Sequence, residues 1–556
     1  MDNTDILIVG AGAAGAVLAA RLSENPSLHV TLVEAGKDTP PDNVPDDIAD
    51  PFPSSYANPE YFWSDVKATI RPNSARRPYP QARIMGGGSS VMGMWAMRGL
   101  AADYDSWASA GAVGWSWSDV LPYFKRLERD VDFPNDNHGT NGPVTIGRIA
   151  ESDWPVIVKT LADAAGKKQL RILPDPSASD EDGVFAIPHS INQETRVTSA
   201  SAYLSDAVRG RENLKILEMT EVRTLAFQNK KVIGAHIRRA DGNVSLLRAS
   251  EIVVAAGGLH SPALLQRSGV GNGRDLSACG IDVVTDLPDV GKNLQNHFYA
   301  HFGTVIRPSA RQDPALRRYG TVGLRLSSGI GEAPPADIFL GLIGRSGRGS
   351  TGNRIGMIAS CLYSAYSRGT VELDPSDPYG SPQVDFNALS DPRDVDRFLC
   401  AARFTRDLLQ DDATRAVTYE SFVIPQNLPV RMLNKPGVTS TLLGAAAAAV
   451  FGMNAATRKA ALRMMIGPGR FLSDINSEDA FAEILLSSVL PMFHVSGTCA
   501  IGSVVDSAAK VIGVEGLRVV DASIMPTLPR ANSNIPTTMI AEKCADHIAE
   551  DFRRGQ

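Results

Sequence analysis

The sequence places one histidine where a strand end would present it to a cleft. His494 follows the apolar stretch 489–493 and precedes a Gly-Thr turn at 497–498. An imidazole held in this way can take the proton of a weakly acidic hydroxyl at neutral pH, an effect worth about a hundred- to ten-thousand-fold in rate. His494 is therefore the candidate general base. His29, His138, His236 and His547 have no such setting, and the roles of His189, His260, His297 and His301 stay open.

A glycine-rich turn near the N-terminus has the spacing that holds a dinucleotide. Gly10, Gly12 and Gly15 follow the apolar run 5–9, and they allow a tight bend, close approach of the backbone to a pyrophosphate, and packing of a helix on a strand. The next strand ends at Glu34, whose carboxylate can accept hydrogen bonds from an adenosine ribose. These features predict a dinucleotide site and leave FAD and NAD open.

The elements around these residues predict a chain that returns several times to one nucleotide-binding sheet. Strands are expected at 5–9 and 29–34, and further strands at 213–217, 251–256 and 516–522. The Pro- and Asp-rich stretch 40–59 predicts an exposed excursion. A last helix is expected at 537–552. The middle of the chain, 300–488, has a strand-like stretch at 369–373 and a helical one at 394–409, but no phosphate-type glycine turn.

Composition restricts the class of protein and its partners. A chain of 556 residues favours two lobes around a cleft, and a net charge of -6 without long charged blocks argues against nucleic acid. Five scattered cysteines predict reduced thiols in a cytoplasmic protein and no metal site. A secretory signal is not expected. The alanine-rich stretch 441–453 is shorter than the ~20 residues of a membrane span, so it predicts a buried or lid helix, with a membrane-surface hairpin as the alternative.

Four motifs, spread over the whole chain, resemble those of the glucose-methanol-choline (GMC) oxidoreductases, a family of FAD-dependent alcohol oxidases and dehydrogenases. They are the glycine-serine loop 82–94 with 98–99, the segment 257–271, the segment 289–297, and the C-terminal group 494–499, 519–526 and 532–537. The resemblance implies an α/β fold, α+β overall, with a Rossmann-type FAD-binding domain and a smaller substrate domain of antiparallel sheet and helices. The expected FAD-binding segments are 1–150, 191–300 and 489–556, and the expected substrate-binding segments are 151–190 and 301–488.

The resemblance also implies which residues hold FAD. Those at the nucleotide turn and its strands are Gly10, Gly12, Ala13, Ala14, Gly15, Glu34, Ala35, Val222 and Ala256. Those in the glycine-serine loop are Arg83, Gly86, Gly87, Ser89, Met92, Gly93 and Met94, and those near the C-terminus are Asp521, Ala522, Asn532, Pro536 and Thr537. Some relatives have at the position of Met92 a histidine that bonds covalently to the flavin. A thioether cannot form that bond, so non-covalent FAD is expected.

By the same resemblance, His494 and Asn532 are the catalytic pair. His494 takes the hydroxyl proton, and the Asn532 amide donates to the substrate oxygen. Asn534 is the alternative to Asn532, with a loop-capping role. Protonated His494 would favour electron transfer to dioxygen, and a quinone or another carrier is the alternative acceptor. A monomer or small homo-oligomer is expected.

The substrate is expected to be an aryl or furan alcohol, because the chain looks most like 5-hydroxymethylfurfural and aryl-alcohol oxidases. Phe493 would supply a flat wall, and Cys361, Tyr363 and Tyr366 are further candidates for the pocket. Choline, polyol and long-chain alcohols are alternatives, the last because segment 434–471 could be a lid. A flavoprotein without alcohol oxidation, such as a photodecarboxylase-like member, and an NAD-linked dehydrogenase are the competing classes.

Overall fold

The N-terminal apolar run forms the central strand of a parallel five-stranded sheet. In this computed structural model, which describes residues 4–426, 444–445 and 448–555, the strand order is β13-β2-β1-β17-β28. The strands are β13 (Leu214–Leu217), β2 (Val30–Val33), β1 (Ile6–Val9), β17 (Glu251–Val254) and β28 (Leu517–Val519). Each lies inside a segment predicted as a strand. Both β1 and β2 are entirely buried, as expected of a parallel sheet covered on both faces.

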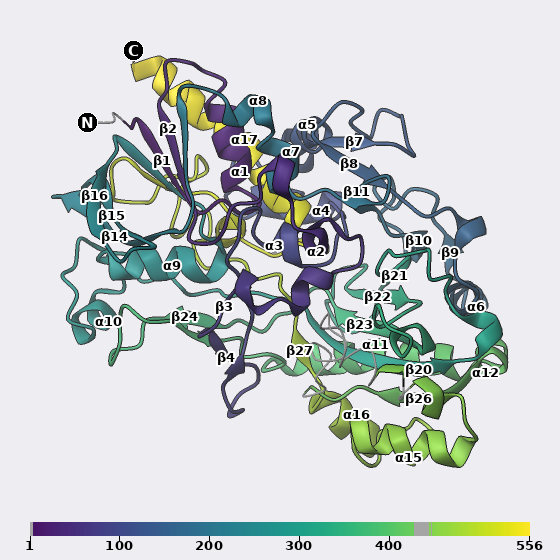
Figure 1. Cartoon of the computed structure of the whole chain (residues 1–556). Coiled ribbons are helices and arrows are strands. Elements are labelled where there is room, and N and C mark those ends of the chain that lie inside the picture. Colours follow the sequence, from purple (N-terminus) through teal and green to yellow (C-terminus); the bar gives the residue numbers. More distant parts are fainter. Residues whose placement is uncertain (1–3, 427–443, 446–447, 556) are drawn as a thin grey trace.

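Helices and a second sheet cover this parallel sheet. The long C-terminal helix α17 (Asn534–Gly555) packs against α1 (Gly15–Leu22) and α5 (Trp117–Leu127), and the three lie together in Figure 1. Arg21 and Arg126 both pair with the buried Glu542 of α17. A three-stranded antiparallel sheet contacts β17 and α9 (Gly257–Arg267); its strands are β14 (Thr220–Gln228), β15 (Lys231–Arg239) and β16 (Val244–Arg248).

The middle of the chain forms a mostly antiparallel eight-stranded sheet. Its order is β26-β20-β23-β22-β21-β10-β9, and β27 also pairs with β20. The strands are β26 (Thr418–Val423), β20 (Phe298–Ile306), β23 (Ile355–Leu362), β22 (Ile338–Ile343), β21 (Val322–Leu326), β10 (Gly183–Ala186), β9 (Arg171–Ile172) and β27 (Leu490–Pro491). Helix α11 (Pro392–Gln410) contacts β20, β22 and β23. Arg397 of α11 is buried between Asp337 and Asp394. The expected α/β fold with a second antiparallel sheet is confirmed.

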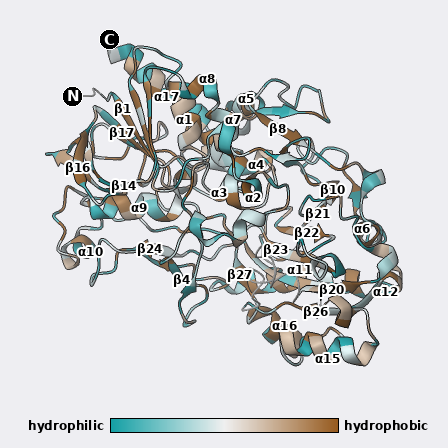
Figure 2. Cartoon of the chain, in the orientation of Figure 1, coloured by the Kyte–Doolittle hydropathy of each residue, from teal (hydrophilic) through white to brown (hydrophobic). Residues whose placement is uncertain are grey.

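Smaller elements join the two large sheets. Two four-stranded sheets consist of β12 (Thr195–Arg196), β11 (His189–Asn192), β8 (Val144–Gly147) and β7 (Glu128–Asp130), and of β24 (Thr370–Glu372), β25 (Gln383–Asp385), β4 (Lys67–Thr69) and β5 (Arg77–Pro78). The two-stranded sheets are β3 (Phe62–Trp63) with β6 (Gln81–Ala82) and β18 (Val270–Gly271) with β19 (Thr285–Asp286). Further helices are α2 (Asp46–Ala49), α3 (Gly88–Val91), α4 (Ala101–Ser109), α6 (Val156–Gly166), α7 (Ser199–Tyr203), α8 (Asp206–Arg209), α10 (Gly273–Ala278) and α12 (Asp412–Val417). In Figure 2 the strands of the parallel sheet are mostly brown, which marks the apolar interior.

Part of the expected lid segment 434–471 lies outside the described residues. Its described portion includes α15 (Ala455–Ile466), which lies at the edge of the molecule next to α16 (Glu478–Leu486) in Figure 1. Arg458 of α15 is buried and pairs with Glu420 of β26, so this helix is tied to the eight-stranded sheet. Among the described residues, none of the helices has the length and apolar character needed to cross a membrane.

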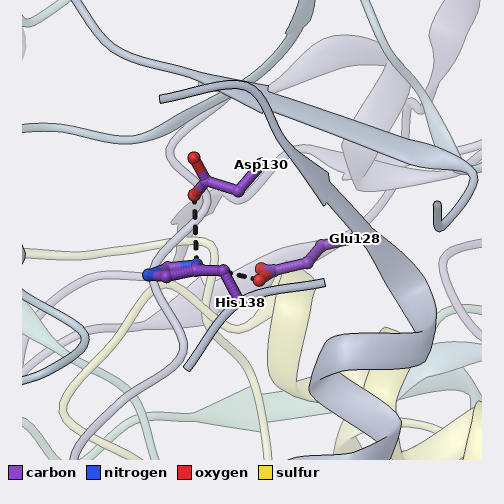
Figure 3. Close-up of side chains that lie close together, drawn as sticks. All are labelled: Glu128, Asp130 and His138. Carbon is purple, nitrogen blue, oxygen red and sulfur yellow. Dashed lines mark hydrogen bonds and ion pairs between the residues drawn. The ribbon is translucent and has the colours of Figure 1, made fainter. Parts of the chain in front are cut away.

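A buried cluster of charged side chains holds the segment that follows β7 (Figure 3). His138 lies within 2.9 Å of Glu128, 3.1 Å of Asp130 and 3.0 Å of Asp175. Burial lowers the pKa of His138, but its hydrogen bonds to these carboxylates outweigh burial and raise the pKa to about 10. Arg98 pairs with Glu128, and Arg148 pairs with Asp130. Three cations thus face three carboxylates, which indicates an ion-pair cluster, although Glu128, Asp130 and His138 also lie close enough together to hold a metal ion.

We expect His138→Gln to destabilise the protein by about 3 kcal/mol at pH 6, because it removes one of the three cations that face the three carboxylates of this buried cluster. The pKa of His138 is raised on folding, so its contribution is complete below its unfolded pKa of about 6.5 and is lost as pH rises through about 10. Urea unfolding at pH 6 and pH 10 measures the destabilisation and its loss at high pH, with a substitution of an exposed histidine, His29→Gln, as control. Equal destabilisation at both pH values, or a metal ion found by elemental analysis, would contradict the ion-pair interpretation.

Candidate active site

A cavity of about 740 Å³ extends from the glycine turn to His494. At one end it is lined by the carboxyl ends of the parallel strands, where a Rossmann-type sheet binds its ligand. Of the predicted cofactor residues, those that line the cavity are Gly10, Gly12, Ala13, Ala14, Glu34, Ala35, Gly87, Ser89, Met92, Gly93, Val222, Ala256, Asp521, Ala522, Asn532 and Thr537. The structure therefore gathers residues from five separated parts of the chain around one space.

The glycine turn leaves backbone surface open to this cavity. A side chain at Gly10 would collide with the carbonyl oxygen of Ala255 at 2.6 Å, and one at Gly15 with the carbonyl oxygen of Gly10 at 1.8 Å. A Cβ at Gly12 would instead meet only the Cα of Gly87, at an ordinary 4.0 Å. The protein itself does not require glycine at position 12, so the free space there fits a ligand that approaches the backbone closely.

Two carboxylates brace the strand ends around the cavity. Glu34 accepts hydrogen bonds from the backbone N–H groups of Ala11 at 2.9 Å and Gly36 at 2.7 Å. Burial raises the pKa of Glu34, and these N–H groups act against that rise. Asp521 accepts from the N–H of Gly257 at 2.8 Å and from the Ser261 hydroxyl at 2.5 Å. Glu34 thus shapes the first turn, and Asp521 fixes the start of α9.

The glycine-serine loop is joined to the nucleotide turn by its backbone. The N–H of Gly86 donates to the carbonyl of Ala11 at 2.8 Å, and the Ser89 hydroxyl donates to the carbonyl of Gly86 at 2.6 Å. Gly87 has φ of 54°, and a Cβ there would lie 2.9 Å from the Cα of Gly12. Glycine is required at position 87 on both counts. The loop then brings Met92 to the cavity wall.

His494 reaches the cavity from the segment that follows β27. Gln295 and Ser496 form an antiparallel bridge, and the backbone N–H of Met492 donates to the carbonyl of His297 at 2.8 Å. The backbone N–H of His494 donates to the Asn296 side-chain oxygen at 3.3 Å. His494 is 8% exposed, and this burial lowers its pKa to about 3. The ring is therefore neutral and able to accept a proton at ordinary pH.

Asn532 lies directly against His494. Its Nδ2 is 3.0 Å from the Nε2 of His494, and its Oδ1 accepts a hydrogen bond from the Tyr363 hydroxyl at 3.2 Å. Asn534, the alternative that the sequence left open, begins α17 and also lines the cavity, but no contact with His494 is recorded for it. The geometry therefore favours Asn532 as the partner of His494.

Aromatic side chains line the cavity on the far side of His494. Phe493 stacks on Tyr79 with ring centroids 5.6 Å apart and contacts Tyr56 at 5.7 Å. Further aromatic residues of the lining are Trp63, Trp95, Tyr299 and Tyr319. Carboxylates that line the cavity are Glu34, Asp521 and Glu221, and Glu221 is paired with Arg223 and Arg238. The described wall around Phe493 is thus aromatic and suits a neutral, planar group.

Three residues expected in the substrate pocket are not among the residues that line the cavity. Cys361 is fully buried within β23. Tyr363 stacks on His297, meets the His494 ring edge-on and donates its hydroxyl to Asn532. Tyr366 lies against the guanidinium groups of Arg393 and Arg397. Proximity in sequence to 367–369 could not distinguish side chains that face the cavity from those packed behind it.

Five residues expected to hold the cofactor lie behind the cavity wall. Arg83 lies over the Trp63 ring at 4.7 Å and donates to the carbonyl of Ala35. The others are Gly15, Gly86, Met94 and Pro536, which the cavity lining does not include. Residues without an assigned role in the sequence are also at the site: His301 lines the cavity, and His297 contacts His494. Asn296 and His297 end the motif 289–297, and this was the sequence signal that could have assigned His297 to the site.

The shape and chemistry of the cavity fit FAD. The open backbone at Gly12 suits a pyrophosphate, because it lies just before the N-terminus of α1, and helix N-termini favour anions. The cavity continues past Met92 to His494, so one ligand can extend from the nucleotide turn to the candidate base.

Comparisons with known proteins agree with this arrangement. The family model for the N-terminal part of GMC oxidoreductases matches residues 4–299, and the C-terminal one matches 365–541. The chain is 36% identical to 5-(hydroxymethyl)furfural oxidase of Methylovorus sp. (strain MP688), over 98% of both chains, and 30% identical to oxygen-dependent choline dehydrogenase of Sinorhizobium fredii, over 98% and 95%. It also resembles pyridoxine 4-oxidase from Mesorbium loti, at a TM-score of 0.79 and 27% identity over 99% of both chains.

The two family models together cover most of the chain, and both relatives match it nearly end to end. The chain belongs to the GMC oxidoreductase family and is an FAD-dependent alcohol oxidoreductase.

Proposed function

We propose that the chain oxidises a primary aryl or furan alcohol to the aldehyde, and further to the acid when the aldehyde is hydrated, with dioxygen as electron acceptor. The observation that carries this proposal is the contact of neutral, buried His494 with Asn532, between a nucleotide turn and an aromatic wall. FAD supplies the hydride acceptor when it is bound. The protein supplies the base, the hydrogen-bond donor and the dry pocket.

His494 and Asn532 divide the work on the hydroxyl group. In the structure the Nδ2–H of Asn532 donates to the lone pair on Nε2 of His494. When the alcohol binds, that lone pair takes the hydroxyl proton, and the Nδ2–H donates instead to the oxygen as negative charge develops on it. The Tyr363 hydroxyl holds the amide in this orientation by donating to its oxygen. Because Asn532 stays neutral at every working pH, only His494 changes charge during the proton transfer.

The aromatic lining supports an aryl or furan alcohol. Phe493 is held flat by its stacking on Tyr79, so it offers a planar group a fixed face. Cationic substrates such as choline are bound by aromatic groups together with a carboxylate. Among the described residues around Phe493, the cavity lining has no carboxylate that is free of a cationic partner. The similarity to 5-(hydroxymethyl)furfural oxidase points in the same direction.

We propose that FAD is held without a covalent bond and that dioxygen reoxidises it. The thioether of Met92, at the cavity wall, cannot form a histidyl bond to a flavin. A protonated His494 beside the site would stabilise the negative charge that develops on reduced oxygen. Acid precipitation should leave the yellow chromophore in the supernatant, and a yellow pellet would contradict non-covalent binding.

We expect His494→Ala to retain FAD but to slow flavin reduction by about a hundred- to ten-thousand-fold, because the hydroxyl proton has no acceptor. Anaerobic stopped-flow absorbance with furfuryl alcohol measures this rate, and the exposed His236→Ala is the matched control. Reduction at the wild-type rate in His494→Ala would show that another group is the base.

The substrate proposal predicts a rank order. Benzyl and furfuryl alcohols should bleach the bound flavin faster than hexanol or choline under argon, because their rings stack on the wall around Phe493. The same panel with dioxygen and with an artificial quinone compares the acceptors, and hydrogen peroxide should form with dioxygen. Faster reduction by choline, or turnover with quinone alone, would select the dehydrogenase alternative. No bleaching by any alcohol would support a flavoprotein with another activity.

The lowered pKa of His494 predicts that kcat/KM does not fall as the pH decreases from neutral to mildly acidic values. Burial brings this pKa to about 3, so the neutral base predominates at every pH above that value. We expect kcat/KM to be constant between pH 5 and pH 7, whereas an ordinary histidine with a pKa of about 6.5 would cause a fall over this range. Steady-state oxygen consumption measures the profile, and a fall centred near pH 6.5 would contradict it.

A further inference from the structure

The second ring nitrogen of His494 contacts another histidine. The Nδ1 atoms of His494 and His297 are 2.9 Å apart, and the two ring planes meet at 86°. Both rings are buried. Two nitrogens at this distance form a hydrogen bond only when one carries a proton and the other a lone pair, so the two neutral rings must adopt complementary tautomers.

The neighbours of His494 decide where its proton lies. Asn532 directs its Nδ2 toward Nε2 of His494, and its Oδ1 accepts from the Tyr363 hydroxyl. An amide N–H can donate only to a lone pair, so Nε2 carries none of the ring's hydrogen. The proton of neutral His494 therefore lies on Nδ1 and is donated to Nδ1 of His297.

His297 must then carry its own proton on Nε2. Among the described residues, this nitrogen has no hydrogen-bond partner of ordinary geometry. Burial lowers the pKa of His297 well below its usual value, and the nearby carbonyls of Pro529 and Tyr363 act in the opposite direction. Carbonyl oxygens attract an N–H and repel a lone pair, so this environment favours the Nε2–H tautomer.

The position of His297 is fixed by packing. It lies just before β20, and its carbonyl accepts from the backbone N–H of Met492 at 2.8 Å. Its ring stacks on Tyr363 at 4.1 Å, and Tyr363 stacks on Phe339 at 4.8 Å. The acceptor nitrogen is thus held by a buried residue directly before β20 of the eight-stranded sheet.

We propose that His297 is a positioning residue, which accepts the Nδ1 proton of His494 and so keeps the Nε2 lone pair of the base facing the cavity. This inference rests on the proposed function, in which His494 takes the substrate proton at Nε2. When that proton arrives, Nδ1–H remains bonded to His297, so the ring need not turn. A carboxylate has this role in the Ser-His-Asp triad, whereas a neutral imidazole adds no negative charge beside the base.

Few charges surround the pair. The phenol of Tyr363 faces both rings, and each histidine faces the other. Among the described residues, neither a carboxylate nor a Lys or Arg side chain contributes to the pKa shift of either histidine. A charge introduced at position 297 should therefore have an effect on His494 that nearby ions do not mask.

Three variants of His297 test this role. His297→Asn places an amide oxygen near the position of Nδ1 and keeps an acceptor. His297→Phe keeps a ring to stack on Tyr363 but has no acceptor. His297→Asp adds a carboxylate. FAD content is measured first, and the rate constant and apparent dissociation constant for furfuryl alcohol are then obtained from anaerobic flavin reduction, with His494→Ala alongside.

We expect His297→Phe to retain FAD, and we expect furfuryl alcohol to reduce its flavin about 10- to 100-fold more slowly than in the wild type. The apparent dissociation constant for furfuryl alcohol should change less than about threefold. His297→Asn should stay within about threefold of the wild-type rate. His297→Asp should move the acid limb of the pH profile upward by at least about one unit, because a nearby negative charge favours protonated His494.

Equal rates in the Phe and Asn variants, whether fast or slow, would overturn the role of His297. An unchanged acid limb in a folded, FAD-loaded Asp variant would overturn it as well. If the Asp variant does not fold, the comparison of Phe with Asn still decides. Slow reduction in His494→Ala together with equal Phe and Asn rates would reject this inference and leave the proposed function intact, whereas fast reduction in His494→Ala would reject both.

Discussion

The hydrogen bond between the Asn532 amide and the His494 imidazole is the constraint on which the site depends. It joins the segment before α17 to the segment after β27, and it holds a neutral base and a neutral donor within 3.0 Å of each other. Burial is what makes this pair useful, since it keeps the imidazole unprotonated. Exposure of the ring to water would raise its pKa toward about 6.5, so that below this pH most of the imidazole would be protonated and would have no lone pair for the chemistry.

Two different sheets hold the two ends of the cavity. The parallel sheet ends at the glycine turn, where the backbone at Gly12 is left open for a pyrophosphate. The antiparallel sheet places His297 and Tyr363 behind the base and its partner. The chain crosses repeatedly between the sheets, which explains why residues distant in sequence line one cavity. Strand ends on rigid sheets position side chains more accurately than loops do.

The sequence predicted the elements with strong local signals. The glycine turn and the short apolar strands predicted the parallel sheet, and the context of His494 made it the candidate base, a role that stays a prediction. The sequence could not show that Tyr363 lies behind Asn532. The direction of a side chain just after the end of a strand depends on the local backbone conformation, which the sequence pattern does not give. The sequence also left His297 without a role, since a contact between residues 197 positions apart has no local signature.

A crystal structure of the FAD-loaded protein with a bound alcohol analogue tests the central claim most directly. Our account predicts that Nε2 of His494 and Nδ2 of Asn532 both lie about 3 Å from the alcohol oxygen, with the carbinol carbon between them and the flavin ring. An imidazole turned away from that oxygen, or an analogue bound elsewhere in the cavity, would contradict it.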